Sequence, residues 1–251
     1  MLCVLNLLVC ATAATIEPEG GAPTSAVIFM HGLGGSGSEL RWMAEMLKPK
    51  LPHTRFIFPS APERPITVNG GMRMPAWYDI ASLDAVLAQQ DDVKGLKRSA
   101  KLLRRLAEEQ LAAGVQRVAI GGFSQGGAVA LFAALIQSLD VRVSAVVALS
   151  TYLPSRDKLG KRLADPALHS GGAAAVPPVL MCHGKADGTV QYRHGKASAK
   201  ALKALGVRTI FRSFKGLQHS VNADVIADVA QFLRKRLAAT EAAGERREDE
   251  L

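Results

Sequence analysis

The sequence predicts an α/β fold, with a mostly parallel central sheet and helices on both of its faces. The first observation is a series of short, continuous apolar runs, as expected of strands that are buried on both faces. The second is that segments with helical character separate most of these runs. The predicted strands are residues 26–30, 55–58, 118–120, 145–150, 179–184 and 208–211.

The helices are predicted from apolar periodicity and from the residues at their ends. The longest, residues 91–113, has apolar residues at near-helical spacing with basic residues between them, and Gly114 ends it. Ser38 is the predicted N-cap of a helix over residues 38–47, which Pro49 stops. The other predicted helices are residues 128–135, 193–205 and 221–237.

Length and composition fit a single domain with flanking segments. With 251 residues, 48% of them hydrophobic, the chain is long enough to bury a large core. We predict one folded domain over residues 26–238. An apolar N-terminal segment and linker, residues 1–25, precedes it, and a charged tail, residues 239–251, follows it.

Charge and cysteine content exclude two classes of function. The formal net charge of +9 favours anionic surfaces such as lipid headgroups, so a transient contact with a membrane surface stays open. Lys and Arg are scattered through helical segments such as residues 94–105, with few aromatic residues to stack on bases, so we exclude nucleic-acid binding. Cys3, Cys10 and Cys182 lack metal-ligand spacing, which argues against a zinc site or a disulfide framework.

The residues around Ser124 have the pattern of a nucleophile elbow. Gly122-Phe123-Ser124-Gln125-Gly126 matches G-x-S-x-G and lies between a β-branched run and an apolar helix. A serine at the tip of so tight a turn leaves no room for side chains two residues away, which accounts for both glycines. The following helix directs its N-terminal amides and positive dipole end toward the turn, where they stabilise an oxyanion. Ser124 is therefore the candidate nucleophile.

Residues 31–37 form a glycine-rich loop after the first predicted strand. Its four glycines let backbone amides turn inward, and this is where such a nucleophile needs a second oxyanion donor. The amide of Leu33 is our candidate, together with the amide of Gln125. A phosphate-binding loop is disfavoured because no Lys-Ser/Thr pair follows the glycines. His31 is predicted to orient the turn rather than to take part in catalysis.

A serine nucleophile of this kind needs a histidine base and a carboxylate, and both occur downstream. Asp187 lies just past the predicted strand 179–184, and His219 lies in a loop before the last helix. The order Ser…Asp…His is the one expected after a G-x-S-x-G elbow. Asp157 and Asp165 are alternative carboxylates, but no strand fixes the charged segment that contains them.

Residues 59–78 form a long proline-containing segment with no clear period, and long irregular loops in compact domains tend to be functional. Its thioethers and aromatic rings suit an apolar acyl chain. We predict that a groove for such a chain is lined by Met74, Trp77, Ile80 and Leu83. The alternative is that these residues only pack the loop onto the sheet.

Six sequence blocks between residues 26 and 237 occur together and in order. They are His31-Gly32-Leu33-Gly34, Ser60-Ala61-Pro62, Pro75-Ala76-Trp77-Tyr78-Asp79, Gly122-Phe123-Ser124-Gln125-Gly126-Gly127, His183-Gly184…Asp187…Val190 and Gly216…His219-Ser220. These blocks resemble the signature blocks of the acyl-protein thioesterase/lysophospholipase family of α/β-hydrolases. The resemblance implies the α/β-hydrolase fold, with Ser124, Asp187 and His219 at the triad positions and Leu33 and Gln125 at the oxyanion-hole positions. The chain departs from the family pattern at Gly35, where Asp is usual, and at Gln191, where Pro is usual.

The resemblance also implies an activity. A serine hydrolase of this family cleaves acyl thioesters, notably those of S-palmitoylated proteins, with lysophospholipids or short-chain carboxylic esters as alternative substrates. No metal or organic cofactor is expected. A non-catalytic binding protein with the same fold is the alternative of another class, and the presence of all three triad residue types in order disfavours it.

The ends of the chain bear on where the protein acts. Residues 1–14 are apolar and contain Ala11-Thr12-Ala13, which looks like a signal-peptide cleavage site, but no Lys or Arg occurs among them. Residues 248–251 resemble a K-D-E-L retrieval signal, and Cys3 or Cys10 is a candidate for acylation. We expect a cytoplasmic protein, as the resembled family mostly is. The secretory pathway is the alternative if residues 1–14 act as a signal peptide.

Overall fold

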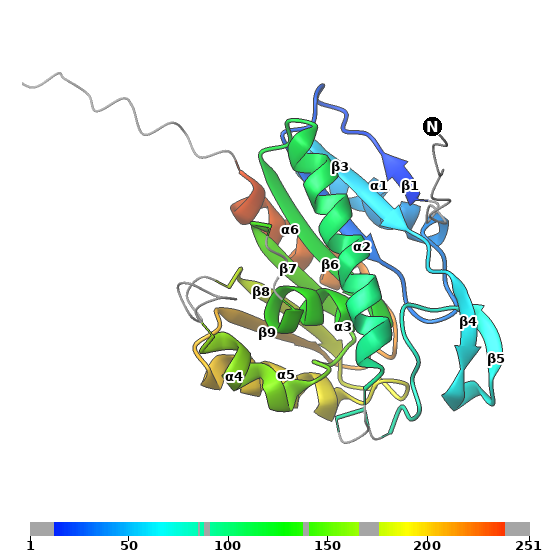
Figure 1. Cartoon of the computed structure of the whole chain (residues 1–251). Helices are drawn as coiled ribbons and strands as arrows, with labels where there is room; N and C mark the ends of the chain where they lie inside the picture. Colours follow the sequence, from blue (N-terminus) through cyan, green and yellow to red (C-terminus); the bar gives the residue numbers. More distant parts are fainter. Residues whose placement is uncertain (1–12, 85, 88–90, 138–140, 166–175, 239–251) are drawn as a thin grey trace, which may run out of the picture.

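The computed structural model describes residues 13–84, 86–87, 91–137, 141–165 and 176–238 (Figure 1). Its centre is a seven-stranded sheet in which the first edge strand is antiparallel to its neighbour and all other neighbouring pairs are parallel. In spatial order the strands are β1 (Ala13–Ile16), β3 (Thr54–Pro59), β2 (Ser25–Met30), β6 (Arg117–Phe123), β7 (Ala145–Leu149), β8 (Val179–Gly184) and β9 (Thr209–Phe214). The predicted α/β fold with a mostly parallel sheet is confirmed.

Helices cover both faces of this sheet and enclose two separate apolar cores (Figure 1). On one face lie α1 (Arg41–Leu47) and α6 (Ala223–Leu237). On the other lie α2 (Val93–Ala112), α3 (Gln125–Phe132), α4 (Leu159–Leu163) and α5 (Tyr192–Ala204). Because β2, β7 and β8 are buried along their whole length, their sequences do not alternate between polar and apolar residues, and apart from Ser25 and His183 their side chains are apolar.

Local signals fix the ends of the long helices. The Asp92 carboxylate accepts a hydrogen bond from the Gly95 amide at 2.8 Å and caps α2, and Asn222 caps α6 in the same way through the Val225 amide at 3.0 Å. The predicted helix 38–47 differs at its start: Ser38–Leu40 is a 3₁₀ turn whose N-cap is Gly37, so Ser38 is not the cap. Further 3₁₀ turns are Lys48–Lys50, Thr67–Asn69 and Arg156–Lys158, and a π-helical turn, Ala133–Gln137, extends α3.

Two predictions about the first part of the chain were wrong. β1 pairs with β3 along residues that we assigned to a linker, so the folded domain begins by Ala13 rather than at residue 26. The segment 59–78 is not wholly irregular, because β4 (Glu63–Ile66) and β5 (Met72–Pro75) form an antiparallel pair within it. Prolines are tolerated in these two strands because a two-stranded ribbon has only edge strands.

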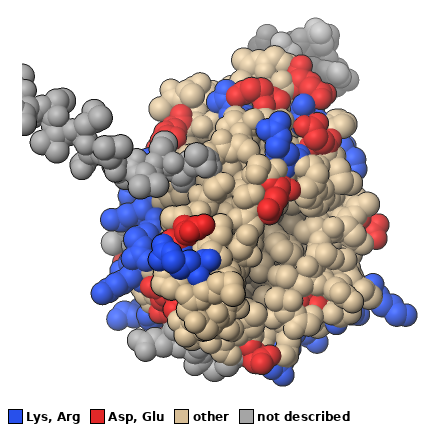
Figure 2. All heavy atoms as spheres, turned by 90° about the vertical axis from the view of Figure 1, so that its right-hand side faces the viewer, with Lys and Arg blue, Asp and Glu red and all other residues tan. Residues whose placement is uncertain are grey.

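The parallel sheet places the functional residues together. Ser124 follows β6, Asp187 follows β8 and His219 follows β9, and these strands all end at the same edge of the sheet. The space-filling view in Figure 2 shows a face whose middle is largely uncharged, with Lys and Arg gathered mainly along one side. Within the described ranges no helix is long and apolar enough to cross a membrane. Cys3, Cys10 and residues 248–251 lie outside the described residues.

Candidate active site

The elbow predicted around Ser124 is present. Ser124 has a φ of +52° and separates β6 from α3, which is the strained geometry that a nucleophile elbow requires. A Cβ on Gly122 would collide with the backbone of Gly126, and one on Gly126 would collide with the Met30 carbonyl oxygen. The Thr151 hydroxyl donates a hydrogen bond of 2.6 Å to the Ser124 carbonyl oxygen. The turn is therefore packed so closely that only glycine fits two residues before and two residues after the serine.

The carboxylate of Asp187 is held by the turn that follows β8. Its Oδ1 accepts hydrogen bonds from the amides of Thr189 at 3.0 Å and Val190 at 2.9 Å. Its Oδ2 lies 2.8 Å from Nδ1 of His219, which donates to it. Asp187 is only 5% exposed. The structure thus brings together the aspartate and histidine that the sequence paired.

Asp187 is ionised in spite of its burial. Burial alone would raise the pKa of this carboxyl, but hydrogen bonds from His183, His219 and the Val190 amide, with the charge of His219, hold the pKa well below its usual range. A carboxylate that only accepts hydrogen bonds fixes the proton of His219 on Nδ1. The Nε2 atom of His219 is then free to accept a proton.

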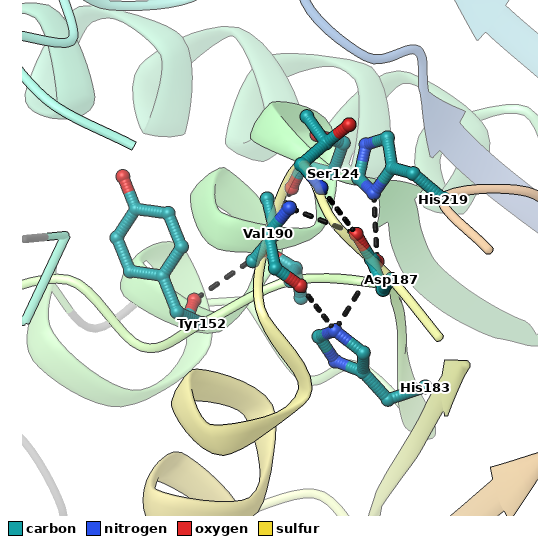
Figure 3. Close-up of polar contacts among 8 residues, drawn as sticks. Ser124, Tyr152, His183, Asp187, Val190 and His219 are labelled. Carbon is teal, nitrogen blue, oxygen red and sulfur yellow. Dashed lines mark hydrogen bonds and ion pairs between the residues drawn. The ribbon is translucent and has the colours of Figure 1, made fainter. Parts of the chain in front are cut away.

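His219 lies at the elbow that carries Ser124 (Figure 3). Its ring packs on Phe123, the residue before the serine, with centroids 4.7 Å apart. Its side chain is 18% exposed, and it borders an open hollow of about 520 Å³ lined by Ala186, Gly188, Thr189, Gln218, His219 and Ser220. The histidine therefore contacts the residue that precedes Ser124 and also has access to solvent.

Of the three candidate carboxylates, Asp187 is the one with a described hydrogen bond to His219. Asp157 is exposed within the 3₁₀ turn Arg156–Lys158, and Asp165 follows α4 in the same charged segment between β7 and β8. The position of Asp187 directly after a predicted strand was therefore the sequence feature that identified the carboxylate partner of His219.

The loop after β2 is fixed by His31. The Ala61 amide donates to its Nε2 at 2.9 Å, so Nδ1 carries the proton and donates to the Gly32 carbonyl oxygen at 2.6 Å. Burial, opposed only in part by this second hydrogen bond, lowers the pKa of His31, which agrees with a neutral ring. The Gly34 amide donates to the Pro75 carbonyl oxygen at 2.9 Å and holds the other end of the loop. The predicted orienting role of His31 is confirmed.

Both polar atoms of the Gln125 side chain form hydrogen bonds with the backbone of a neighbouring loop. Its Oε1 accepts from the Trp77 amide at 2.8 Å, and its Nε2 donates to the Tyr78 carbonyl oxygen at 2.7 Å. Gln125 is the first residue of α3. Its backbone N–H therefore lies in the first turn, where N–H groups have no acceptor within the helix. This is the amide predicted, with that of Leu33, to bind an oxyanion.

Two of the four residues predicted to line an acyl groove do not fit that role. Trp77 is 0% and Ile80 3% exposed, and Trp77 donates from Nε1 to the His31 carbonyl oxygen at 2.8 Å. They pack the loop onto the sheet, which was the alternative. Met74 and Leu83 are half-buried, so they remain candidates. The position of each residue along this apolar segment did not show which residues would be buried and which would be partly exposed.

Two features of the site were not predicted. Gln191, where the resembled family has proline, donates from Nε2 to Asp84 Oδ1 at 3.0 Å and ties the start of α5 to the segment that contains Leu83. His183 contacts Asp187 from the side opposite His219 (Figure 3). The sequence had singled out His183 within a block but gave it no role. Among the described residues there is no group of three or more His, Cys, Asp or Glu side chains that could hold a metal ion.

A strained elbow serine beside a hydrogen-bonded aspartate and histidine, at the carboxyl edge of a mostly parallel sheet, defines a serine hydrolase with the α/β-hydrolase fold. The chain belongs to the phospholipase/carboxylesterase family, whose model matches residues 11–237. That match also includes β1, which we had placed outside the domain.

Relatives with known names agree with this assignment. Acyl-protein thioesterase 1 of Gibberella zeae is 36% identical over 232 residues, which cover 90% of this chain and 96% of that protein. Acyl-protein thioesterase 1 of Candida albicans is 34% identical over 230 residues, covering 89% and 96% of the two chains. The crystal structure of Zea mays acyl-protein thioesterase 2 superposes with a TM-score of 0.82 at 32% identity, covering 91% of this chain and all of that one.

Proposed function

We propose that this serine hydrolase cleaves acyl thioesters, with S-palmitoylated proteins as its substrates. The observation that carries the proposal is the hydrogen bond between His219 and the buried Asp187 carboxylate at the elbow that carries Ser124. The names of its relatives support the choice of a protein thioester. Lysophospholipids and short-chain esters need the same site and are the alternative substrates. The presence of all three catalytic groups, Ser124, His219 and Asp187, argues against a binding protein without catalytic activity.

The reaction follows from the protonation states of these groups. The Ser124 hydroxyl attacks the thioester carbonyl carbon while its proton passes to Nε2 of His219, and Asp187 stabilises the resulting imidazolium. The tetrahedral intermediate expels the thiolate, which takes the proton from His219, and the acyl group stays on Ser124. Water then attacks the acyl-enzyme while the neutral His219 takes its proton, and His219 returns that proton to the Ser124 oxygen as the fatty acid is released. We place the oxyanion between the amides of Leu33 and Gln125.

Thioesters are expected to be the better substrates. A thiol has a pKa of about 8.5, so a thiolate leaves with little help from a general acid, whereas an alkoxide must be protonated as it leaves. We expect kcat/KM for a palmitoylated cysteine peptide to exceed that for the same peptide palmitoylated on serine, and that for a lysophospholipid. Thiol release and fatty-acid release measure the rates. Faster hydrolysis of the lysophospholipid would instead assign the protein as a lysophospholipase.

We also propose that Met74 and Leu83 contact the acyl chain. Each methylene buried in an apolar groove contributes about 0.8 kcal/mol, or about fourfold in kcat/KM, until the groove is full. Leu83→Ala is expected to lower kcat/KM about tenfold for long acyl thioesters and to leave acetyl thioesters unchanged. A series of chain lengths measures this effect.

A matched variant separates binding from packing. Leu106, on α2, is also a half-buried leucine packed against the same core as Leu83. Leu106→Ala is expected to lower the thermal midpoint without changing the dependence on chain length. If Leu83→Ala lowers activity equally at every length, Leu83 only packs the loop.

We place the protein in the cytoplasm, where it meets S-acylated proteins at membrane surfaces through transient contacts. Ala13 and Ala14 belong to β1, so cleavage within the Ala11–Ala14 region would cut or shorten the edge strand of the sheet. This supports a retained N-terminus. Mass spectrometry of the native N-terminus tests it, and a mature chain beginning near Ala14 would place the protein in the secretory pathway.

A further inference from the structure

The Asp187 carboxylate contacts two histidines, and the triad accounts for only one of them. Oδ2 lies 2.8 Å from Nδ1 of His219 and 3.3 Å from Nε2 of His183 (Figure 3). Oδ1 accepts the amides of Thr189 and Val190. Each carboxylate oxygen is therefore approached by two donors, and the carboxylate is held on both sides.

The contacts of His183 assign its proton. Its Nε2 is 2.7 Å from the Val190 carbonyl oxygen as well as 3.3 Å from Asp187 Oδ2. A carbonyl and an ionised carboxylate only accept hydrogen bonds, so Nε2 must carry a proton and donate to both. His183 thereby ties the carboxylate to the far end of the turn from residue 187 to residue 190.

The ring of His183 is itself fixed. The residue is 1% exposed and belongs to β8, so its backbone is anchored in the sheet. The ring of Tyr192 meets it edge-on, with centroids 6.0 Å apart and an interplanar angle of 80°. Gly195 on α5 lies so close that a Cβ there would collide with Nδ1 of His183. The donor at Nε2 is thus held by both β8 and α5.

We propose that His183 is a positioning residue that fixes the Asp187 carboxylate in the orientation in which it receives the His219 proton. This inference rests on the proposed catalytic role of Asp187 and His219. Without the donor at Nε2, the Oδ2 atom that faces His219 loses its second contact, and the carboxylate can pivot about the Oδ1 atom that the Thr189 and Val190 amides hold. His219 then loses its alignment with Ser124. A misplacement of about 1 Å at a reacting group can lower a rate about 10²-fold, so the effect is expected in kcat rather than KM.

Two substitutions of His183 test this proposal. His183→Phe keeps an aromatic ring and removes the donor, whereas His183→Gln keeps an N–H near the position of Nε2. We expect His183→Phe to lower kcat about 10²-fold on an acetyl thioester with little change in KM, and His183→Gln to restore most of the loss. His194→Phe is the matched control, because His194 is also buried and contacts neither Asp187 nor His219 in the described structure. It is expected to keep its kcat.

His183→Phe in the Asp187→Asn background shows whether His183 affects kcat through Asp187. If His183 acts through Asp187, His183→Phe causes almost no further loss there, because residues that act as a unit are not additive. An equal fractional loss in both backgrounds, or an unchanged kcat in His183→Phe, would overturn the proposal. If Asp187→Asn alone leaves kcat unchanged, the proposed triad fails instead, so the two failures are distinguishable.

Thermal midpoints are recorded for every variant, and rates are expressed per folded protein. If His183→Phe does not fold, Gly195→Ala replaces it, because the added methyl group displaces the His183 ring from the side of α5. Gly195→Ala is then expected to lower kcat and leave KM unchanged. Full activity in a folded Gly195→Ala variant would count against the proposal.

Discussion

Ser124→Ala is expected to lower kcat for a palmitoyl thioester by about 10⁶-fold, the scale of loss when the nucleophile of a serine hydrolase is removed. The remaining rate comes from substrate binding and the oxyanion hole, neither of which the substitution removes. Alanine keeps the Cβ that serine already carries at a φ of +52°, so the strain of the elbow is unchanged. Steady-state hydrolysis measures the loss, and the thermal midpoint shows that the variant folds.

Ser150 provides a matched control for this experiment. It is a buried serine with a φ of +47°, at the end of β7, and its backbone amide donates to the Cys182 carbonyl oxygen. Ser150→Ala is expected to keep nearly all of its activity. If the two alanine variants lose activity equally, the loss reflects a general disturbance of the turns at this edge of the sheet, and Ser124 is not the nucleophile.

Asp187→Asn is expected to lower kcat about 10⁴-fold, the loss produced by the equivalent change in a triad of the same geometry on another fold. The amides of Thr189 and Val190 retain the amide oxygen of the new side chain at the position of Oδ1. The NH₂ group is then directed at His219, where it donates to Nδ1. This moves the proton of His219 to Nε2, which no longer accepts the proton of Ser124.

Asp157→Asn is the control, because Asp157 is exposed in the turn Arg156–Lys158, whereas the described carboxylate partner of His219 is Asp187. Its kcat is expected to stay near the wild-type value. Measurements of kcat on the same thioester, with thermal midpoints, compare the two variants. The reverse order of effects would mean that the wrong carboxylate has been assigned.

The parts of the site that are predictable from sequence are those that local sterics or chain order determine. The elbow needs glycine on both sides of Ser124, because the backbone of α3 approaches that of β2 and β6, and so the motif is visible in five residues. The partners of Ser124 were found because each follows a strand in a fixed order. The glycine-rich loop and the elbow also suggested the amides of Leu33 and Gln125 as oxyanion donors, and the resemblance to a known family implied the same two positions.

The rest depends on contacts between distant segments. β1 is a four-residue edge strand, and nothing in its sequence distinguishes it from a linker until β3 lies beside it. Trp77 and Ile80 have the composition of a ligand groove, yet long-range packing buries them. The contact of His183 with Asp187 arises because β8 ends in a turn that folds back on the strand. Neither hydrophobic periodicity nor residue propensity predicts a turn that folds back on its own strand.

The central claim is that Ser124 forms the covalent intermediate with the help of His219 and Asp187. Mass spectrometry of peptides from the protein after reaction with a fluorophosphonate tests it most directly. We predict a single adduct on the peptide that contains Ser124, its formation slowed by excess palmitoyl thioester and greatly slowed in Asp187→Asn. An adduct on another residue, or none in a preparation that still hydrolyses the thioester, would contradict the account.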